Sequence, residues 1–443
     1  MRSRLLLAFV VVLLGVASQA PPSGRVRLAG HGVADDRGVF PALGGTLFWA
    51  AWGYKHDRPR LDAALKLLAD HRFDYIRALG IVGRQPYWSG REIDWRWPDY
   101  TEVIAGLTDY AYDRFGLRVE WTIFADADQV IPNPEDRVKL IDTFIAMSRG
   151  REHKIMHFEV ANESWQNGFG GPDGIAQIRQ LAKRLTEATD IPVAISDSEG
   201  HECGDHLALY KDTGADIQTE HFSRDLGGPL RGWGPVIAPW SVRECAGLPT
   251  VVSNNEPVGP KSSIASESDP MRIIGGATAS YMAGVGLYVF HTDAGVWGRT
   301  AISDMPNAAA ILDGFAAMKA YLPADIVNWR RHRHDSKESP FIPYAGKARG
   351  AIWPDGHDNG AAEVLGSDQD GRFFVLPIGI VNGLTLEARR NMEFDVLHPL
   401  TGVKLEHHAL KPGETVRPRP LQVIVISGRF TDGGTGGRED GGT

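Results

Sequence analysis

The sequence is poor in cysteine and has no excess of basic residues. Cys203 and Cys245 are the only cysteines among 443 residues, and their spacing does not suggest a metal site. The formal net charge is −8 at pH 7, so the chain lacks the basic field with which proteins attract nucleic acids or anionic membranes. We therefore expect neither of these as a partner.

Long hydrophobic runs are equally scarce. One run, LLLAFVVVLLGVA, follows Arg2 and Arg4 within residues 1–20 and leads into small residues. This order is typical of a secretory signal peptide, with cleavage after Ala17. The run is short for a permanent anchor, although an uncleaved anchor is the alternative. We expect a secreted or periplasmic protein without membrane contact after cleavage. In such a compartment a disulfide between the two cysteines is favoured over two separate thiols.

Strand-like and helix-like segments alternate through the first three quarters of the chain. The expected strands are Leu43–Ala50, Tyr75–Leu79, Val119–Phe124, Ile155–Ala161, Pro192–Ser196, Ile217–Phe222, Thr250–Asn254 and Gly286–His291. The expected helices are Arg60–Asp70, Tyr100–Phe115, Glu135–Ser148, Ile175–Thr189, Asp205–Lys211, Met271–Met282 and Ala308–Tyr321. Eight such strands predict an α/β fold, a (β/α)8 TIM barrel over residues 21–328. An open doubly wound sheet is less favoured because Leu43–Thr46 is not a glycine-rich phosphate turn.

The pattern changes after Trp329. Short alternating segments such as GRFFVLPIGIV and LQVIVISGRF are separated by Asp-Gly, Asn-Gly and Pro-Gly turns. They predict a C-terminal antiparallel β-sandwich domain over residues 329–430. Residues 431–443 are Gly-rich and polar with nothing to bury, so we expect a disordered tail. A short hairpin is expected around Asp35–Gly38.

Two Asn-Glu pairs end expected strands. Asn162–Glu163 closes the fourth strand in HFEVANESW, and Asn255–Glu256 closes the seventh in TVVSNNEP. Barrel enzymes carry their chemistry at this C-terminal rim of the strands. A single Asn-Glu pair has little specificity, because most acids are solvated surface groups. Two glutamates on two strand ends predict a carboxylate pair that cleaves glycosides.

The segment from Phe158 to Glu163 resembles the fourth-strand signature of the retaining glycoside hydrolases of clan A. That signature is an aromatic residue and Glu, two further residues, and then Asn-Glu. The resemblance covers about residues 40–325 as an architecture and identifies no individual family. It implies that Glu163 is the acid/base and Glu256 the nucleophile of a double displacement through a covalent glycosyl-enzyme. Glu159 shares side-chain parity with Glu163 and is interpreted as a buried structural acid.

The resemblance also implies substrate-binding residues. Asn162 would bind the sugar 2-hydroxyl, and Arg77, in FDYIRALG, would keep Glu256 ionised unless it forms a surface salt bridge instead. His221 matches a histidine after the sixth strand, but Ser223 stands where many of these families have tyrosine. Trp297 is the candidate floor under the bound sugar, although simple packing is an equal alternative.

Aromatic residues are frequent in the expected rim loops. Packing is the better explanation for each alone, but together they favour a carbohydrate cleft. The further candidates for sugar contacts are Trp52, Tyr87, Trp88, Trp165 and Trp233.

The favoured hypothesis is a secreted retaining glycoside hydrolase that cleaves β-glycosidic bonds in an oligosaccharide or polysaccharide. No cofactor or metal is expected, and the protein should be a monomer or small homo-oligomer. Two rivals stay open. One is a non-catalytic carbohydrate-binding barrel, and the other is a metal-dependent barrel hydrolase using His221, His291 and Asp293. The lack of a Gly-x-Ser-x-Gly elbow argues against an esterase.

Overall fold

The computed structural model describes residues 22–200, 202–227, 231–242, 244–262, 265–333, 336–345, 348–349, 363–378 and 383–432. The predicted signal peptide, residues 1–20, lies outside the described residues, as does the predicted tail from residue 433 onward. Within the described ranges, no helix has both the length and the apolar character needed to cross a membrane.

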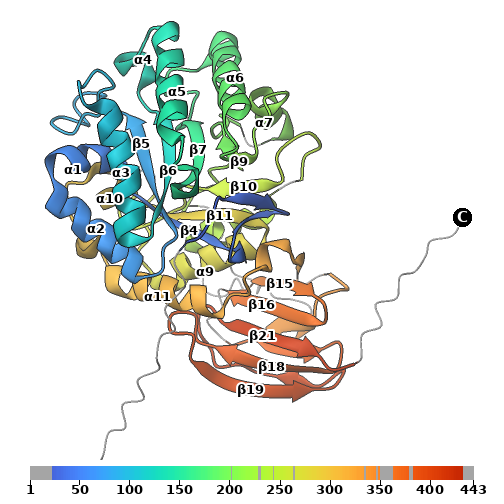
Figure 1. Ribbon diagram of the computed structural model, residues 1–443. Helices are drawn as coiled ribbons and strands as arrows, with labels where there is room; N and C mark the ends of the chain where they lie inside the picture. The colour runs from blue at the N-terminus through green and yellow to red at the C-terminus, as the bar shows by residue number, and fades with distance from the viewer. Residues whose placement is uncertain are drawn as a thin grey trace, which may run out of the picture.

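Eight parallel strands close into a barrel in the order β10-β11-β4-β5-β6-β7-β8-β9 (Figure 1). Their residues are buried throughout, as expected for parallel strands covered on both faces. The predicted barrel is therefore confirmed. The strands are β4 (Ala42–Thr46), β5 (Tyr75–Ile81), β6 (Arg118–Phe124), β7 (Ile155–Ala161), β8 (Val193–Ala194), β9 (Ile217–Thr219), β10 (Val251–Asn254) and β11 (Val285–Phe290).

Helices surround this barrel and follow its strands in the chain. Three of them begin with a cap and a proline in the first turn: Asp57 accepts a hydrogen bond from the Arg60 amide, Asn133 from the Glu135 amide and Asp269 from the Met271 amide. All seven predicted helices are present. They are α2 (Arg58–Asp70), α3 (Tyr100–Phe115), α5 (Pro134–Ser148), α6 (Gly171–Ala188), α7 (Cys203–Tyr210), α9 (Pro270–Met282) and α11 (Ala308–Tyr321).

Short elements fill the loops between these helices and strands. They are α1 (Ala50–His56), α4 (Ala127–Val130), η1 (Glu152–Lys154), η2 (Arg231–Trp233), α8 (Gly234–Ile237), η3 (Ala238–Ser241), α10 (Asp293–Trp297), η4 (Ile302–Asp304) and η5 (Ile326–Asn328). Three of these short helices, η2, α8 and η3, follow one another directly over residues 231–241.

Several predicted strand boundaries were wrong. The first expected strand, Leu43–Ala50, ends at Thr46, and the apolar run continues into helix α1. Apolar residues continue because Trp49 is buried in the wall and donates its indole N–H to the Ala294 carbonyl. Strands β8 and β9 are also shorter than Pro192–Ser196 and Ile217–Phe222, because the chain leaves the sheet early to build the rim.

The predicted hairpin around Asp35–Gly38 is present in an N-terminal sheet of β1 (Arg27–Ala29), β2 (Gly32–Asp35) and β3 (Gly38–Phe40). Val33 and Phe40 join barrel residues such as Met156 in one apolar cluster. Buried Arg118, at the start of β6, pairs with Asp35 at 3.0 Å. The hairpin therefore packs against the end of the barrel opposite the strand C-termini.

Two antiparallel sheets form the C-terminal part and enclose an apolar core that includes Phe341, Phe373 and Phe394. The predicted β-sandwich is confirmed. The six-stranded sheet contains β12 (Arg330–Arg333), β15 (Glu363–Gln369), β16 (Arg372–Ile378), β21 (Val425–Phe430), β18 (Met392–Leu397) and β19 (Lys404–Leu410), in that order. The four-stranded sheet contains β14 (Ala348–Arg349), β13 (Phe341–Ala345), β17 (Thr385–Ala388) and β20 (Thr415–Val416).

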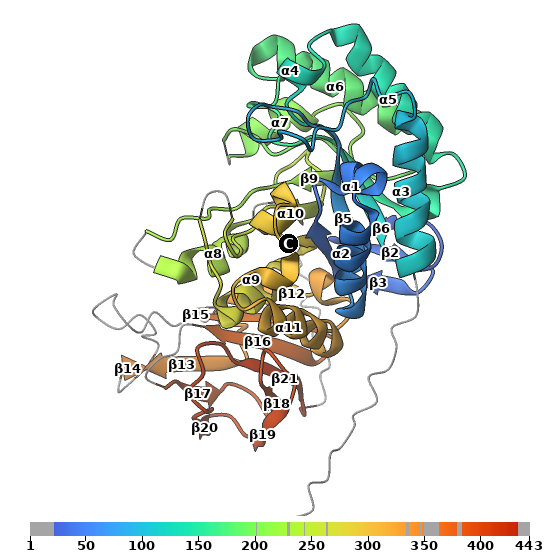
Figure 2. The same cartoon turned by 90° about the vertical axis from the view of Figure 1, so that its left-hand side faces the viewer.

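Helices α9 and α11 lie between the barrel and the six-stranded sheet (Figure 2). Phe374 of β16 stacks on Tyr321 of α11 with ring centroids 6.4 Å apart. Leu365, Phe374 and Leu376 belong to the same apolar cluster as the barrel residues. One continuous core therefore spans both parts.

Cys203, at the start of α7, and Cys245, before β10, form the expected disulfide, with a sequence separation of 42. Closing a loop of this length removes chain entropy from the unfolded state, so the bond should stabilise the fold by about 4 kcal/mol. We expect a Cys203→Ser/Cys245→Ser double variant to lose about this much free energy of unfolding, measured by denaturant titration without reductant. Reduced wild type should match the variant. Equal stability of variant and oxidised wild type would contradict this expectation.

Candidate active site

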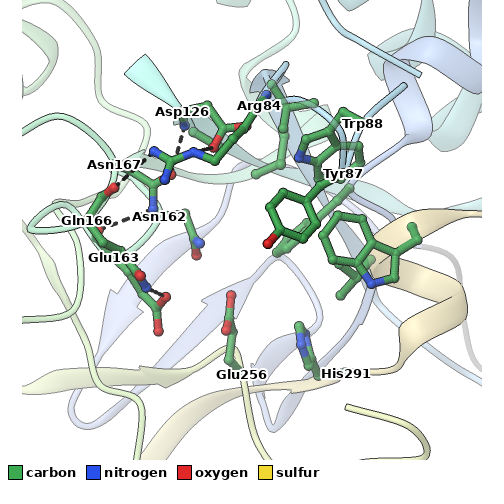
Figure 3. Close-up of a pocket in the computed structure, with 16 residues that line it drawn as sticks. Arg84, Tyr87, Trp88, Asp126, Asn162, Glu163, Gln166, Asn167, Glu256 and His291 are labelled. Atoms are coloured by element: carbon green, nitrogen blue, oxygen red, sulfur yellow. Dashed lines mark hydrogen bonds and ion pairs between the residues drawn. The ribbon is translucent and has the colours of Figure 1, made fainter. Parts of the chain in front are cut away.

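The two predicted glutamates meet at the C-terminal rim of the barrel. Glu163 follows β7 and Glu256 follows β10, the fourth and seventh barrel strands in chain order. A carboxylate oxygen of each and a ring nitrogen of His221 all lie within 4.8 Å of one another. Figure 3 shows both carboxyl groups directed into one cavity. Glu163 itself has a φ of 33°, a strained backbone conformation for a non-glycine residue and one that recurs at functional sites.

Arg77 lies beneath this pair and is fully buried on β5. Its Nη1 donates to Glu256 Oε1 at 3.0 Å, and its Nη2 donates to Asn162 Oδ1 at 2.8 Å and to Glu159 Oε2 at 2.6 Å. Burial disfavours the guanidinium charge, but the surrounding carboxylates outweigh burial and raise the Arg77 pKa. Arg77 is thus a permanent buried cation, not part of a surface salt bridge.

Glu159 and Glu120 form the acidic layer below. Glu159 accepts hydrogen bonds from Thr122, Thr219 and Asn255 at 2.6, 2.8 and 2.9 Å. Burial opposes its charge, but Arg77 and these donors hold the Glu159 pKa below its usual value. Glu120 contacts Arg77 Nε at 3.1 Å, yet burial dominates there and raises its pKa to about 8. Glu159 therefore has the structural role inferred from its parity.

His221, in the segment after β9, connects the two glutamates to this layer. Its Nε2 lies 2.9 Å from Asn255 Oδ1, and its Nδ1 lies 3.0 Å from Glu163 Oε1. The Asn255 amide nitrogen donates to Glu120 and Glu159, so its oxygen is left to accept from His221. Burial favours a neutral ring, but nearby carboxylates, Glu256 first, raise the His221 pKa to about 9. His221 is therefore an imidazolium that donates to Glu163.

Glu256 has cations on both sides. Arg77 binds Oε1, and Arg224 Nη1 lies 3.4 Å from Oε2. Burial alone would raise the Glu256 pKa, but His221 and the two arginines hold it well below its usual range. Glu256 is therefore ionised near neutral pH, which is the state that a nucleophile needs.

His291, directly after β11, stands beside Glu256 (Figure 3). Its Nδ1 lies 3.0 Å from Thr46 Oγ1, and its Nε2 has no hydrogen-bond partner among the described residues. Burial lowers the His291 pKa to about 4, so the ring is neutral. A neutral ring that lines a cavity with one open nitrogen suits hydrogen bonding to a hydroxyl group.

Two cavities meet at the glutamates. The first, of about 250 Å³, is lined by Asn162, His291 and a set of aromatic residues. The second, of about 920 Å³, is lined by more polar groups, among them Asp197 and Arg224. Glu163, Gln166 and Glu256 line both. A bound molecule could therefore extend to either side of the carboxylate pair.

Four of the aromatic candidates line the two cavities, and the other two lie away from them. Trp297, on α10, stacks on Tyr87 with ring centroids 5.9 Å apart and touches Trp88 at 5.0 Å, and all three line the first cavity. Trp165 is 38% exposed and lines the second. Trp52 packs on His56 and lines neither cavity, and Trp233 lies under Arg272, also away from both.

The described residues contain one group with metal-ligand chemistry, Glu163, His221 and Glu256. It does not suit a cation, because His221 is protonated and two arginines contact Glu256. Neither His291 nor Asp293 belongs to this group. The ligand set of the metal-dependent rival is therefore not assembled in the described part of the chain.

Sequence reasoning missed three residues of the site. Arg224 contacts Glu256, Gln166 Nε2 donates to Glu163 Oε2, and Glu120 lies in the acidic layer. Glu120 had a detectable signal, because an acid inside an apolar strand is buried and needs a partner. Arg224 and Gln166 lie in irregular segments whose local pattern carries no such signal.

No family model matches the chain, and no curated protein matches it. Solved structures do share its fold. A glycoside hydrolase family 5 protein from Bacteroides vulgatus has a TM-score of 0.63 at 11% identity, covering 92% of this chain and 94% of its own. A second glycoside hydrolase has a TM-score of 0.57 at 8% identity, covering 92% and 97%. An alpha-amylase from Geobacillus thermoleovorans, in complex with acarbose, has a TM-score of 0.55 at 12% identity, covering 88% and 98%. At these identities the likeness establishes a shared fold.

Proposed function

We propose that this protein is a glycoside hydrolase that cleaves its substrate with retention of anomeric configuration. The carboxylate pair at the barrel rim carries the proposal. Retaining enzymes hold their two carboxyl groups about 5–5.5 Å apart, whereas inverting enzymes leave about 6.5–9.5 Å for a water molecule. Oxygens of Glu163 and Glu256 lie within 4.8 Å, which fits the retaining arrangement.

The surroundings of each glutamate support its proposed role. Glu256 is buried, ionised and held by Arg77, so it is the nucleophile that attacks the anomeric carbon. Glu163 lies at the rim between the two cavities and donates its proton to the leaving oxygen. The sugar is then esterified to Glu256, whose charge is lost. Glu163, now ionised and accepting from His221, takes a proton from the water that releases the sugar.

The first cavity supports a sugar as the substrate. Trp297, Tyr87 and Trp88 provide flat aromatic faces that stack on the apolar face of a pyranose. Asn162 and His291 add polar groups for hydroxyls beside Glu256. The solved structures with the same fold include glycoside hydrolases. The β-configuration of the bond rests on the resemblance at the fourth strand, and export rests on the N-terminal segment.

A panel of aryl α- and β-glycosides and polysaccharides tests the proposal. We expect hydrolysis of at least one β-glycoside, unaffected by a chelator, and proton NMR should show the β-anomer as the first product. An α-anomer formed first from a β-glycoside would mean inversion and would refute the mechanism. Binding without hydrolysis would favour the carbohydrate-binding rival, and loss of activity with chelator would favour the metal-dependent one.

A further inference from the structure

We infer that Arg224 is a positioning residue for the nucleophile. Its guanidinium fixes the orientation of the Glu256 carboxylate and sets the acid limit of activity. This inference rests on the proposed function and assigns a role to a residue that the fourth-strand resemblance does not cover. The nearest position with an expected contact is Ser223, whose hydroxyl accepts from the Asp225 amide instead.

The guanidinium of Arg224 spans both carboxylates. Nη1 lies 3.4 Å from Glu256 Oε2, and Nη2 lies 3.7 Å from Glu163 Oε1. The residue is 8% exposed and lines the larger cavity, so it belongs to the wall of the site and not to the outer surface. Protonated His221 also lies near both glutamates, with its Nδ1 3.0 Å from Glu163 Oε1 and 4.0 Å from Glu256 Oε2.

The two arginines hold different oxygens of Glu256. Arg77 binds Oε1 from β5 below, and Arg224 approaches Oε2 from the segment after β9. With one donor on each oxygen, rotation of the carboxylate about its last bond breaks at least one contact. Without Arg224, Oε2 would keep only the longer contact with His221 Nδ1, at 4.0 Å, and could turn more easily.

The position of Arg224 also suits the change of charge during the reaction. Glu256 is the ionised carboxylate in the free enzyme. When its oxygen bonds to the anomeric carbon and the proton of Glu163 passes to the leaving oxygen, the negative charge moves to Glu163. Arg224 lies beside the ionised carboxylate in both states, so no buried cation loses its counterion at either step.

Several groups besides Arg224 influence the ionisation of Glu256. They are Arg77 from β5, His221 from the segment after β9, His291 after β11 and Glu163 after β7. Arg77 and His221 are retained when Arg224 is replaced. A cation within about 4–6 Å lowers a carboxyl pKa by about 1–3 units. Removing Arg224 should therefore raise the pH below which activity is lost, by an amount within that range.

The test compares Arg224→Gln, Arg224→Lys and the control Arg184→Gln, using the best aryl glycoside of the panel. Arg184 is exposed on α6 and pairs with Asp142. Arg224→Gln should lower kcat by about 10²-fold, the cost of a misplaced reacting group, and move the acid limb of kcat/KM upward by about 1 pH unit or more. Arg224→Lys should keep the acid limb near that of wild type but recover kcat only in part, because one ammonium cannot span both carboxylates. The control should match wild type.

A cyclitol epoxide that esterifies the nucleophile gives a readout independent of turnover. Its inactivation rate should show the same upward shift in Arg224→Gln, with Glu256 identified as the labelled residue by peptide mass spectrometry. An unchanged acid limb in both assays, in a variant that unfolds at the wild-type temperature, would overturn the role of Arg224. If Arg224→Gln does not fold, the pH profile of Arg224→Lys becomes the test. An acid limb of kcat/KM that lies about 1 pH unit above that of wild type in Arg224→Lys would then overturn the role of Arg224. Wild type that neither hydrolyses the panel nor reacts with the epoxide would refute the proposed function.

Discussion

Replacing Glu256 by alanine should lower kcat on an aryl glycoside by about 10⁴–10⁶-fold, the range seen when the nucleophilic machinery of another hydrolase is removed. The reason is specific to this site. In the proposed mechanism Glu256 is the attacking carboxylate, and His221, Arg77 and Arg224 keep it ionised. Glu163 cannot replace it, because the same mechanism needs Glu163 as the proton donor. Initial rates with an activated leaving group provide the measurement.

Azide separates the roles of the two glutamates. In Glu163→Ala, azide should attack the glycosyl-enzyme and give a glycosyl azide of retained configuration. In Glu256→Ala, it should enter the space of the lost carboxylate and give the inverted azide. Glu187→Ala is a suitable control because Glu187 is an exposed acid on α6 whose ion pair among the described residues is with Lys183. Near-wild-type activity in either active-site variant would refute the assignment.

Replacing Arg77 by methionine should damage both the fold and the reaction. The change leaves the carboxylates of Glu159 and Glu256 without their buried cation, and breaking a buried ion pair in this way costs about 3–5 kcal/mol. Activity should fall as well, because Glu256 loses the donor to Oε1. Denaturant unfolding and kcat measured on the same preparation would show both effects.

The stability loss in Arg77→Met should grow with pH. In wild type the pKa of Glu159 is lowered, so its contribution to stability is present above the unfolded pKa and is lost only as pH falls through the folded pKa. Without Arg77, burial would raise that pKa above the unfolded value. The variant would then bind more protons when folded than when unfolded, so its stability would decline as pH rises from about 5 to 8.

Arg118→Met is the matched control for this experiment. Arg118 is equally buried and pairs with Asp35 at 3.0 Å, but it lies at the start of β6, at the other end of the barrel. It should lose comparable stability while the folded fraction retains wild-type kcat. A loss of kcat as large as that of Arg77→Met would mean that general destabilisation, not the contact with Glu256, explains the Arg77 result.

The sequence was sufficient for the barrel and for the core of the site. Continuous apolar runs with caps between them define parallel strands and helices, and strand order alone then brings Arg77, Asn162, Glu163 and Glu256 to one rim. The same reasoning shows why Glu159 is buried, since side chains two residues apart on a strand face the same way.

The parts that failed lie where the chain is irregular. The positions of Arg224 and Gln166 depend on the paths of loops, and loop sequences have no periodic pattern from which a path can be predicted. The same is true of which cavity each aromatic residue lines. Trp52 illustrates the limit: it follows the first strand as closely as a rim residue should, but helix α1 turns it toward His56. Strand ends fix the direction of a side chain, whereas a helix or loop beyond them can redirect it.

The core shared by the barrel and the sandwich has a consequence for the evolution of this chain. Val423 lies against Gly275 of α9, Leu400 lies against Gly314 of α11, and Ser367 donates to the Met282 carbonyl. The sandwich thus covers faces of α9 and α11 that would be exposed to water in the barrel alone. A gene fragment ending near residue 329 would encode a protein with an uncovered apolar face, so recombination could not exchange the sandwich for an unrelated binding domain without new surface mutations on α9 and α11. A substitution on one side of this contact therefore has to remain compatible with the residues on the other side.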